Sequence, residues 1–141
     1  MLERRALSNS FTVPLDGQDG LKARFAALWA RCLDSSELEG ANVLNQLAQL
    51  YAEPHRHYHT LGHIRHCLNE FDRASALMDH PDAVELALWF HDAIYVSGAK
   101  DNERRSADLF RKYSSSLADA IFQQRIDDLI MATTHSGSPR Q

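Results

Sequence analysis

The sequence has little cysteine and no long apolar run, and each shortage excludes a class of protein. Its two cysteines, Cys32 and Cys67, are too few for a disulfide framework and have no CxxC partner, so we expect buried thiols in a cytoplasmic protein. No stretch approaches the roughly 18 apolar residues of a membrane span, and the first residues lack the apolar core of a secretory signal. Lys and Arg number 15 against 19 Asp and Glu, which argues against binding to nucleic acid backbones.

The sequence also lacks the alternating pattern of β-strands, internal repeats and low-complexity segments. Its composition and length fit one globular domain. The 141 residues are 44% hydrophobic and 24% charged, as in ordinary folded domains. This length can bury one hydrophobic core but is short for two domains. We expect an irregular lead-in over residues 1–20, one helical domain over residues 21–135 and a short tail over residues 136–141.

Apolar residues recur at the three- and four-residue steps of amphipathic helices, which predicts an all-α, single-domain bundle of about six helices. The expected helices run over residues 21–33, 36–54, 58–78 and 81–96, from residue 101 past residue 110, and over residues 117–133. Ser36 with Glu39 predicts a capping box, and Pro81 suits a first helical turn. The helix that begins at Pro81 is apolar on nearly every face, so we expect it to be buried.

Histidine is unusually frequent, and seven of the eight histidines fall between His55 and His91. His91 and Asp92 directly follow the apolar sequence ALWF. A carboxylate in such surroundings needs a strong partner because burying it alone is costly. A metal ion is one such partner, and the adjacent imidazole is a natural co-ligand. The alternative is a helix-end pair in which Asp92 bonds to backbone or to an arginine.

A second group of histidines lies upstream, on the expected long helix. His59, His63 and His66 are spaced i, i+4, i+7 and therefore share one side of that helix. His63 falls at the border between core and solvent, where a ligand can face a cleft, whereas we expect His66 and His80 to be solvated. Arg56 lies among flanking histidines and is either a bidentate phosphate-binding group or an ordinary surface arginine.

Two further features lie at expected helix ends. His135 follows the last helix in the sequence TTHSGS. An imidazole there gains from the helix dipole, so it is either a cap or a contact for a phosphate or a metal. Asp101 and Asn102 begin the preceding helix, and both are residue types that commonly cap a helix N-terminus.

Four stretches, in this order along the chain, resemble the HD-domain superfamily of metal-dependent phosphohydrolases: RHYHTLGHI, ALWFHDAIY, DNERRSADLF and IMATTHS. The similarity spans residues 21–135 and is closest to a bacterial branch of predicted HD-type phosphohydrolases. It implies an all-helical HD-like fold, in agreement with the helical spacing. The implied reaction is hydrolysis of a small phosphate ester or nucleotide by a metal-activated water.

The resemblance also implies a metal site. His63 matches the first metal-ligand histidine of the superfamily, and His91 and Asp92 match its defining pair of ligands. A mixed set of imidazoles and a carboxylate suits a divalent transition metal, that is Mn²⁺, Fe²⁺, Co²⁺ or Zn²⁺, better than Mg²⁺.

Further roles follow from the same resemblance. Asp92 is the implied catalytic carboxylate, and Glu103 lies in a block typical of this branch, where it would act as a base or orient water. Arg56, Lys100 and His135 are the candidates to bind the phosphate of the substrate.

One feature departs from the superfamily pattern. HD domains complete the metal site with an aspartate on a helix after the last histidine block, whereas Asp127 and Asp128 precede His135 here. We therefore expect a shortened member that holds its metal more weakly and leaves apolar surface uncovered, which favours a homo-oligomer. The main alternative is a catalytically impaired module that binds metal or nucleotide. A di-iron oxygenase and a helical interaction protein with incidental histidines rank below it.

Overall fold

The computed structural model describes residues 16–137, with side chains for residues 20–133, and the regular structure in this range is entirely helical. The elements in chain order are α1 (Asp16–Cys32), α2 (Glu37–Tyr51), α3 (Leu61–Ala74), η1 (Ser75–Leu77), α4 (Pro81–Phe90), α5 (Asn102–Tyr113) and α6 (Ala120–Gly137). The prediction of an all-α protein with about six helices is confirmed. Within the described residues, no helix has both the length and the apolar character needed to cross a bilayer.

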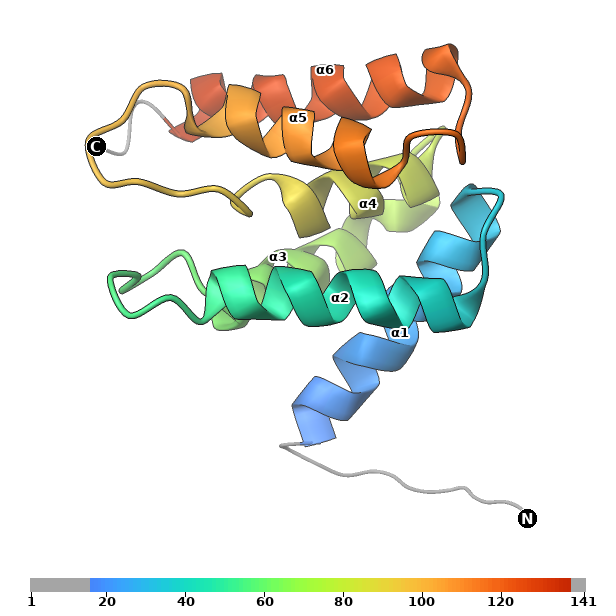
Figure 1. Cartoon of the computed structure of the whole chain (residues 1–141), viewed down its shortest axis with the longest axis horizontal. Helices are drawn as coiled ribbons and strands as arrows, with labels where there is room; N and C mark the ends of the chain where they lie inside the picture. Colours follow the sequence, from blue (N-terminus) through green and yellow to red (C-terminus); the bar gives the residue numbers. More distant parts are fainter. Residues whose placement is uncertain (1–15, 138–141) are drawn as a thin grey trace.

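Helix α4 occupies the centre of the arrangement. It contacts α1 and α3 on one side and α5 and α6 on the other, while α1 packs on α2 and α5 packs on α6 (Figure 1). Its sequence explains this position, because apolar residues cover almost its whole circumference. Leu86, Trp89 and Phe90 have no exposed surface.

Aromatic rings connect α4 to the helices around it. The ring of Phe25 in α1 lies 5.2 Å from that of Trp89, edge to face, and 5.7 Å from that of Trp29. On the other side, Phe90 makes an edge-to-face contact at 5.2 Å with Phe110 of α5. Such pairs add to the free energy gained from apolar burial and restrict ring orientation. The end of α4 that carries His91 is therefore anchored in the core.

Several helix ends follow their sequence signals. Ser36 caps α2, since its hydroxyl accepts a hydrogen bond from the backbone N–H of Glu39 at 3.1 Å. The Glu39 side chain does not complete the predicted capping box and instead accepts from the hydroxyl of Ser35. Pro81 occupies the first turn of α4, as expected. Gly98 has a φ of +83° in the turn after α4, a conformation that favours glycine.

Other boundaries differ from the prediction. Helix α1 begins at Asp16, so part of the expected lead-in is helical. The expected long helix over residues 58–78 is shorter, because the chain is extended at Thr60 and a 3-10 turn follows Ala74. Helix α6 continues to Gly137, so the backbone of His135 lies within the helix and not after it.

Two buried carboxylates on α4 and α6 are paired with arginine. Glu85 accepts a hydrogen bond from Nε of Arg24 at 2.8 Å. Asp127 accepts from Nε of Arg111 at 2.9 Å and from Nη1 of Arg104 at 3.2 Å. Burial alone would raise the pKa of Asp127, but the hydrogen bonds from Arg104 and Arg111 hold it below its ordinary value. Both ion pairs connect neighbouring helices.

Candidate metal centre

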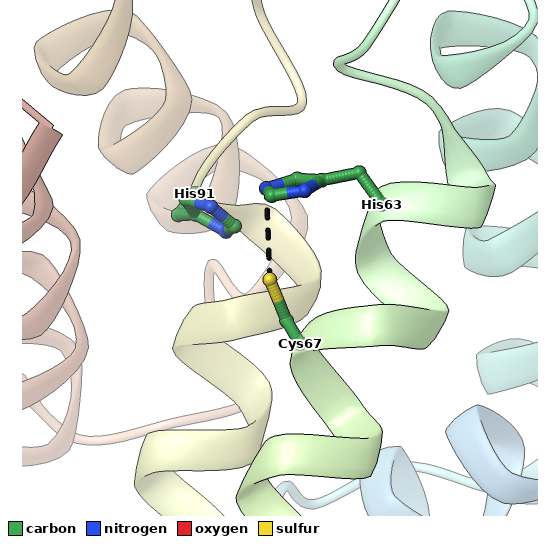
Figure 2. A group of neighbouring side chains, drawn as sticks. All are labelled: His63, Cys67 and His91. Carbon is green, nitrogen blue, oxygen red and sulfur yellow. Dashed lines mark hydrogen bonds between the residues drawn. The ribbon is translucent and has the colours of Figure 1, made fainter. Parts of the chain in front are cut away.

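The candidate site lies where the end of α4 meets the first half of α3. His63 is in the first turn of α3 and Cys67 follows one turn later, while His91 and Asp92 come immediately after the last residue of α4. Figure 2 shows the ring of His63 and the sulfur of Cys67 on one helix, with the ring of His91 approaching from the other. Two helices that are separate in sequence therefore supply one cluster of donors.

Side chains hold the backbone at the end of α4 in place. The hydroxyl of Tyr51 donates to the carbonyl of Trp89 at 2.8 Å, and Nδ1 of His91 donates to the carbonyl of Leu88 at 2.7 Å. These carbonyls belong to the last turn of the helix and would otherwise have no intrahelical partner. The helix therefore ends at Phe90, and His91 and Asp92 lie just beyond it and not inside it.

Arg56 completes this support, and neither prediction made for it describes its position. Its side chain is fully buried and makes four hydrogen bonds. They go to the Glu53 carboxylate and to the backbone carbonyls of His59, Asp92 and Ala93. A guanidinium used in this way is not at the surface and has little capacity left for a phosphate. Its role in this structure is to fix the backbone that carries Asp92.

The three residues predicted as metal ligands converge in the structure. Nε2 of His63 and Nε2 of His91 each lie 3.5 Å from Oδ2 of Asp92. Nδ1 of His59 approaches the same oxygen at 3.0 Å and donates a hydrogen bond to it. Among residues 20–133, no arginine or lysine lies within ion-pair distance of this carboxylate. Its charge is met by imidazoles alone.

The hydrogen bond to Leu88 determines the tautomer of His91. A carbonyl oxygen only accepts, so Nδ1 of His91 carries the proton and the neutral ring has its lone pair on Nε2. That lone pair faces the Asp92 oxygen, which is also an acceptor, across 3.5 Å. Metal-binding histidines commonly donate their second ring nitrogen to a carbonyl in this way. The pair of facing acceptors indicates a place for a cation.

The charge states of the donors also suit a cation. Burial lowers the pKa of His63, and the neighbouring His91 and His59 act in the same direction while Asp92 opposes them. The neutral ring, which is the form that binds metals, is thereby favoured. Burial alone would raise the pKa of Asp92, but the surrounding imidazoles hold it below its ordinary value and keep it ionised.

Cys67 is a donor whose position in the site was not predicted. Its sulfur lies 3.6 Å from Nε2 of His63, and the ligand atoms of His63, Cys67 and His91 all lie within 4.8 Å of one another. It was expected only to be a small buried thiol, and it is half-buried. Its i, i+4 spacing from His63 was available in the sequence as a signal.

His59 and Tyr95 form one wall of the site. The imidazole of His59 stacks on the ring of Tyr95, with ring centroids 4.0 Å apart and an interplanar angle of 24°. The backbone carbonyl of Tyr95 accepts a hydrogen bond from Nε2 of His55 at 2.9 Å. His59 was expected on the helix with His63, but it precedes α3 and orients Asp92 from the loop. His66 is exposed on α3, as expected, and so is His80.

The remaining predicted site residues are not joined to this cluster by hydrogen bonds or ion pairs within the described residues. Lys100 is exposed and Glu103 is half-buried in the first turn of α5. Asp101 occupies the capping position of that helix without a side-chain cap bond, and Asn102 binds both backbone polar groups of Val96. The side chain of His135 lies outside the described residues.

The interatomic distances test whether a metal fits between these donors. Metal–nitrogen and metal–oxygen bonds of about 2.1 Å place neighbouring ligands about 3.0 Å apart in an octahedron and about 3.4 Å apart in a tetrahedron. The observed separations of 3.5 Å from Asp92 to His63 and to His91 are close to the tetrahedral value. The donor set of this site fits a divalent transition metal.

A separate pocket lies at the opposite end of α4. It has a volume of about 700 Å³ and is lined by the loop between η1 and α4, by the first half of α4 and by α6, including Met78, His80, Val84 and Leu129. No predicted ligand of the metal centre is in its lining.

The chain matches no protein-family model, no curated protein and no solved structure. The site offers imidazole and carboxylate donors at the end of α4, and imidazole and thiol donors in the first half of α3.

Proposed function

We propose that this chain is a metal-dependent phosphohydrolase that acts on a small phosphate ester or nucleotide. His63, His91 and Asp92 would hold its divalent metal. The observation that carries the proposal is the Asp92 carboxylate, only 14% exposed, which faces two imidazole nitrogens and has no arginine or lysine within ion-pair distance among residues 20–133. The resemblance to HD-domain phosphohydrolases supplies the class of reaction, and an HD-like bundle is the fold proposed with it.

Each residue has a defined part in this proposal. A bound transition metal would supply polarisation of a phosphoryl oxygen and a lowered pKa for a coordinated water. Asp92 stays ionised and is oriented by the hydrogen bond from His59. His91 keeps a lone pair on Nε2 because its Nδ1 carries the proton and donates a hydrogen bond to the carbonyl of Leu88. Arg56 holds the carbonyl of Asp92 at 2.8 Å and so limits the movement of the carboxylate.

The rim of the site is where a substrate would enter. The side chains of His59 and His63 are about one third exposed, whereas those of His91 and Asp92 are largely covered. The cluster therefore opens toward solvent on the α3 side. A phosphate reaching the cluster from that side would meet His59 and His63 first.

A second function is favoured by a specific observation. Cys67 forms a group of three possible metal donors with His63 and His91, and with Asp92 this would make four protein ligands. Zinc sites with four protein ligands are closed and structural, whereas catalytic sites keep a position open for water. A non-catalytic module that binds metal or nucleotide in the same site is therefore the alternative.

Metal content and turnover distinguish these functions. The protein is purified without chelator, and its metal is quantified together with that of the His91→Ala, Asp92→Ala double variant. The control is His66→Ala, which changes an exposed histidine of the same helix. We expect stoichiometric Mn, Fe, Co or Zn in the wild type and the control, and none in the double variant.

Phosphatase assays with general phosphomonoester and nucleotide substrates then follow, with each metal added back in turn. Turnover that depends on the metal and is lost in the double variant supports the hydrolase. Stoichiometric metal without turnover above the double variant supports the binding module. Wild-type protein without bound metal under any loading condition contradicts both.

A further inference from the structure

We propose that Cys67 is a ligand of the same metal, which makes the site a mixed nitrogen, oxygen and sulfur centre selective for Zn²⁺, Co²⁺ or Fe²⁺ over Mn²⁺ and Mg²⁺. This inference rests on the metal centre proposed above but not on the hydrolytic reaction. It narrows the range of metals that the imidazoles and the carboxylate alone would allow.

The position of the sulfur is the first support. Sγ of Cys67 lies 3.6 Å from Nε2 of His63, and this nitrogen is also the one 3.5 Å from the Asp92 carboxylate. Figure 2 shows the sulfur directed toward the His63 ring, with the His91 ring beside it. The same nitrogen therefore has the carboxylate and the thiol as neighbours, and the donor atoms of His63, Cys67 and His91 all lie within 4.8 Å of one another.

The spacing also agrees with a shared metal. Zinc binds sulfur at about 2.3 Å and imidazole nitrogen at about 2.0 Å, which places tetrahedral sulfur and nitrogen ligands about 3.5 Å apart. The observed separation of 3.6 Å between Cys67 and His63 matches this value. The i, i+4 relation on α3 places both side chains on one face of the helix, so no backbone change is needed.

The chemistry of the donors determines the selectivity. Thiolate ligands favour zinc, copper(I) and iron, whereas Mg²⁺ and Mn²⁺ prefer oxygen donors. Imidazole suits zinc, iron and related metals, so it agrees with sulfur in this preference. A site with two imidazoles and a thiolate should therefore discriminate against Mn²⁺ more strongly than one with His63, His91 and Asp92 alone.

Cys32 offers a matched comparison within the chain. It is the last residue of α1, and burial raises the pKa of its thiol to about 11. It belongs to no cluster of metal-binding side chains among the described residues. The two cysteines therefore differ in surroundings, and substitution of Cys32 tests for unspecific effects of removing a thiol.

Cobalt substitution tests the inference spectroscopically. Apo-protein is titrated with Co²⁺, and the near-ultraviolet sulfur-to-cobalt charge-transfer band is recorded together with the visible ligand-field bands. We expect both sets of bands in the wild type and in Cys32→Ser. In Cys67→Ser we expect the charge-transfer band to vanish, the ligand-field bands to remain, and the affinity for Zn²⁺ to fall by more than about tenfold.

X-ray absorption of the zinc-loaded wild type is a second measurement that needs no variant. We expect one sulfur scatterer at about 2.3 Å together with nitrogen and oxygen scatterers. Bound metal without a sulfur scatterer, or a charge-transfer band that persists in Cys67→Ser, overturns the role of Cys67 and leaves the metal centre intact. Failure of Co²⁺ and Zn²⁺ to bind overturns this inference, whereas the proposed function is overturned only when Mn²⁺ and Fe²⁺ also fail to bind.

Discussion

The side chains of Glu85, Asp127 and Asp92 are all largely buried, but these carboxylates differ in the groups that face them. The side chains of Glu85 and Asp127 are 7% and 5% exposed, and each receives hydrogen bonds from arginine. Asp92 is 14% exposed, and three imidazoles face it within the part of the chain that has described side chains. A buried carboxylate with a guanidinium partner has its negative charge balanced by a permanent cation, whereas one that faces only imidazoles has no permanent cationic partner.

The hydrogen bonds around Asp92 sharpen this difference. Arg56 lies close to Asp92, but its guanidinium donates to the backbone carbonyl and not to the carboxylate. Arg56 therefore fixes the backbone at Asp92 and leaves the carboxylate without an arginine partner. Glu85 and Asp127 therefore form ion pairs with arginines that connect neighbouring helices. Asp92 faces imidazoles instead, which is the environment expected of a metal-binding carboxylate.

The largest effect is expected from removing the arginines that face Asp127. The Arg104→Met, Arg111→Met double variant leaves this buried carboxylate without a cationic partner, which should lower the free energy of unfolding by about 3 kcal/mol. Urea unfolding monitored by circular dichroism measures the change. Arg105→Met, an exposed neighbour on α5, is the control and should change stability little. Equal effects in both variants would contradict the assignment of a structural ion pair.

The effect of metal on stability separates Asp92 from the other two carboxylates. A ligand that binds only the folded state stabilises it by about 2.7 kcal/mol when its free concentration is one hundred times Kd. We expect added Zn²⁺ to raise the Tm of the wild type accordingly and to raise that of Asp92→Asn clearly less. Glu85→Gln is the control and should keep the full shift in Tm. A full shift in Asp92→Asn would exclude this carboxylate as a ligand.

Arg56 connects the stability of the fold to the site. Replacing it with Met releases the carbonyls of His59, Asp92 and Ala93, and each of them that finds no new donor should cost about 1 kcal/mol. Metal affinity should fall as well, because the backbone that carries Asp92 is no longer fixed. Urea unfolding and zinc titration measure the two effects, with the exposed Arg65→Met as control. Metal affinity that is unchanged despite lower stability would show that Arg56 does not position Asp92.

The smallest effect is expected in how the free energy of unfolding decreases as the pH is lowered. The pKa of Asp127 is lower in the folded protein than in the unfolded chain, so near pH 4 the unfolded chain binds more protons. This contribution to stability is complete above the unfolded pKa, about 3.9, and is lost as the pH falls through the folded value. Urea midpoints between pH 7 and pH 3 should therefore fall less steeply in Asp127→Asn than in the wild type. Parallel profiles would contradict the lowered pKa.

Much of the secondary structure could be predicted from periodicity. The apolar steps of α1 to α6 follow the helical repeat, and Pro81 and Ser36 mark two helix starts correctly. The ends were predicted less well because they depend on contacts from elsewhere. The last turn of α4, for example, has the carbonyl of Trp89 bound by the hydroxyl of Tyr51, which is distant in sequence.

The candidate site was predicted in part. The position of His91 and Asp92 after an apolar helix indicated ligands, and the structure brings both together with His63. Arg56 was misjudged because its buried position depends on carbonyls that lie 36 and 37 residues further along the chain. Cys67 and His59 were missed as members of the site because their facing partners belong to another helix and its following turn.

The amino-acid sequence by itself determined which face of each helix is apolar, because that follows from residue spacing along one chain segment. It also determined that an imidazole and a carboxylate stand together at the end of the most apolar helix. Only the tertiary structure decided which faces meet, and hence that α3 delivers a second imidazole and a thiol to Asp92. The physical reason is that hydrophobic burial specifies which surfaces leave water but not their mutual orientation, which depends on side-chain packing and directional hydrogen bonds.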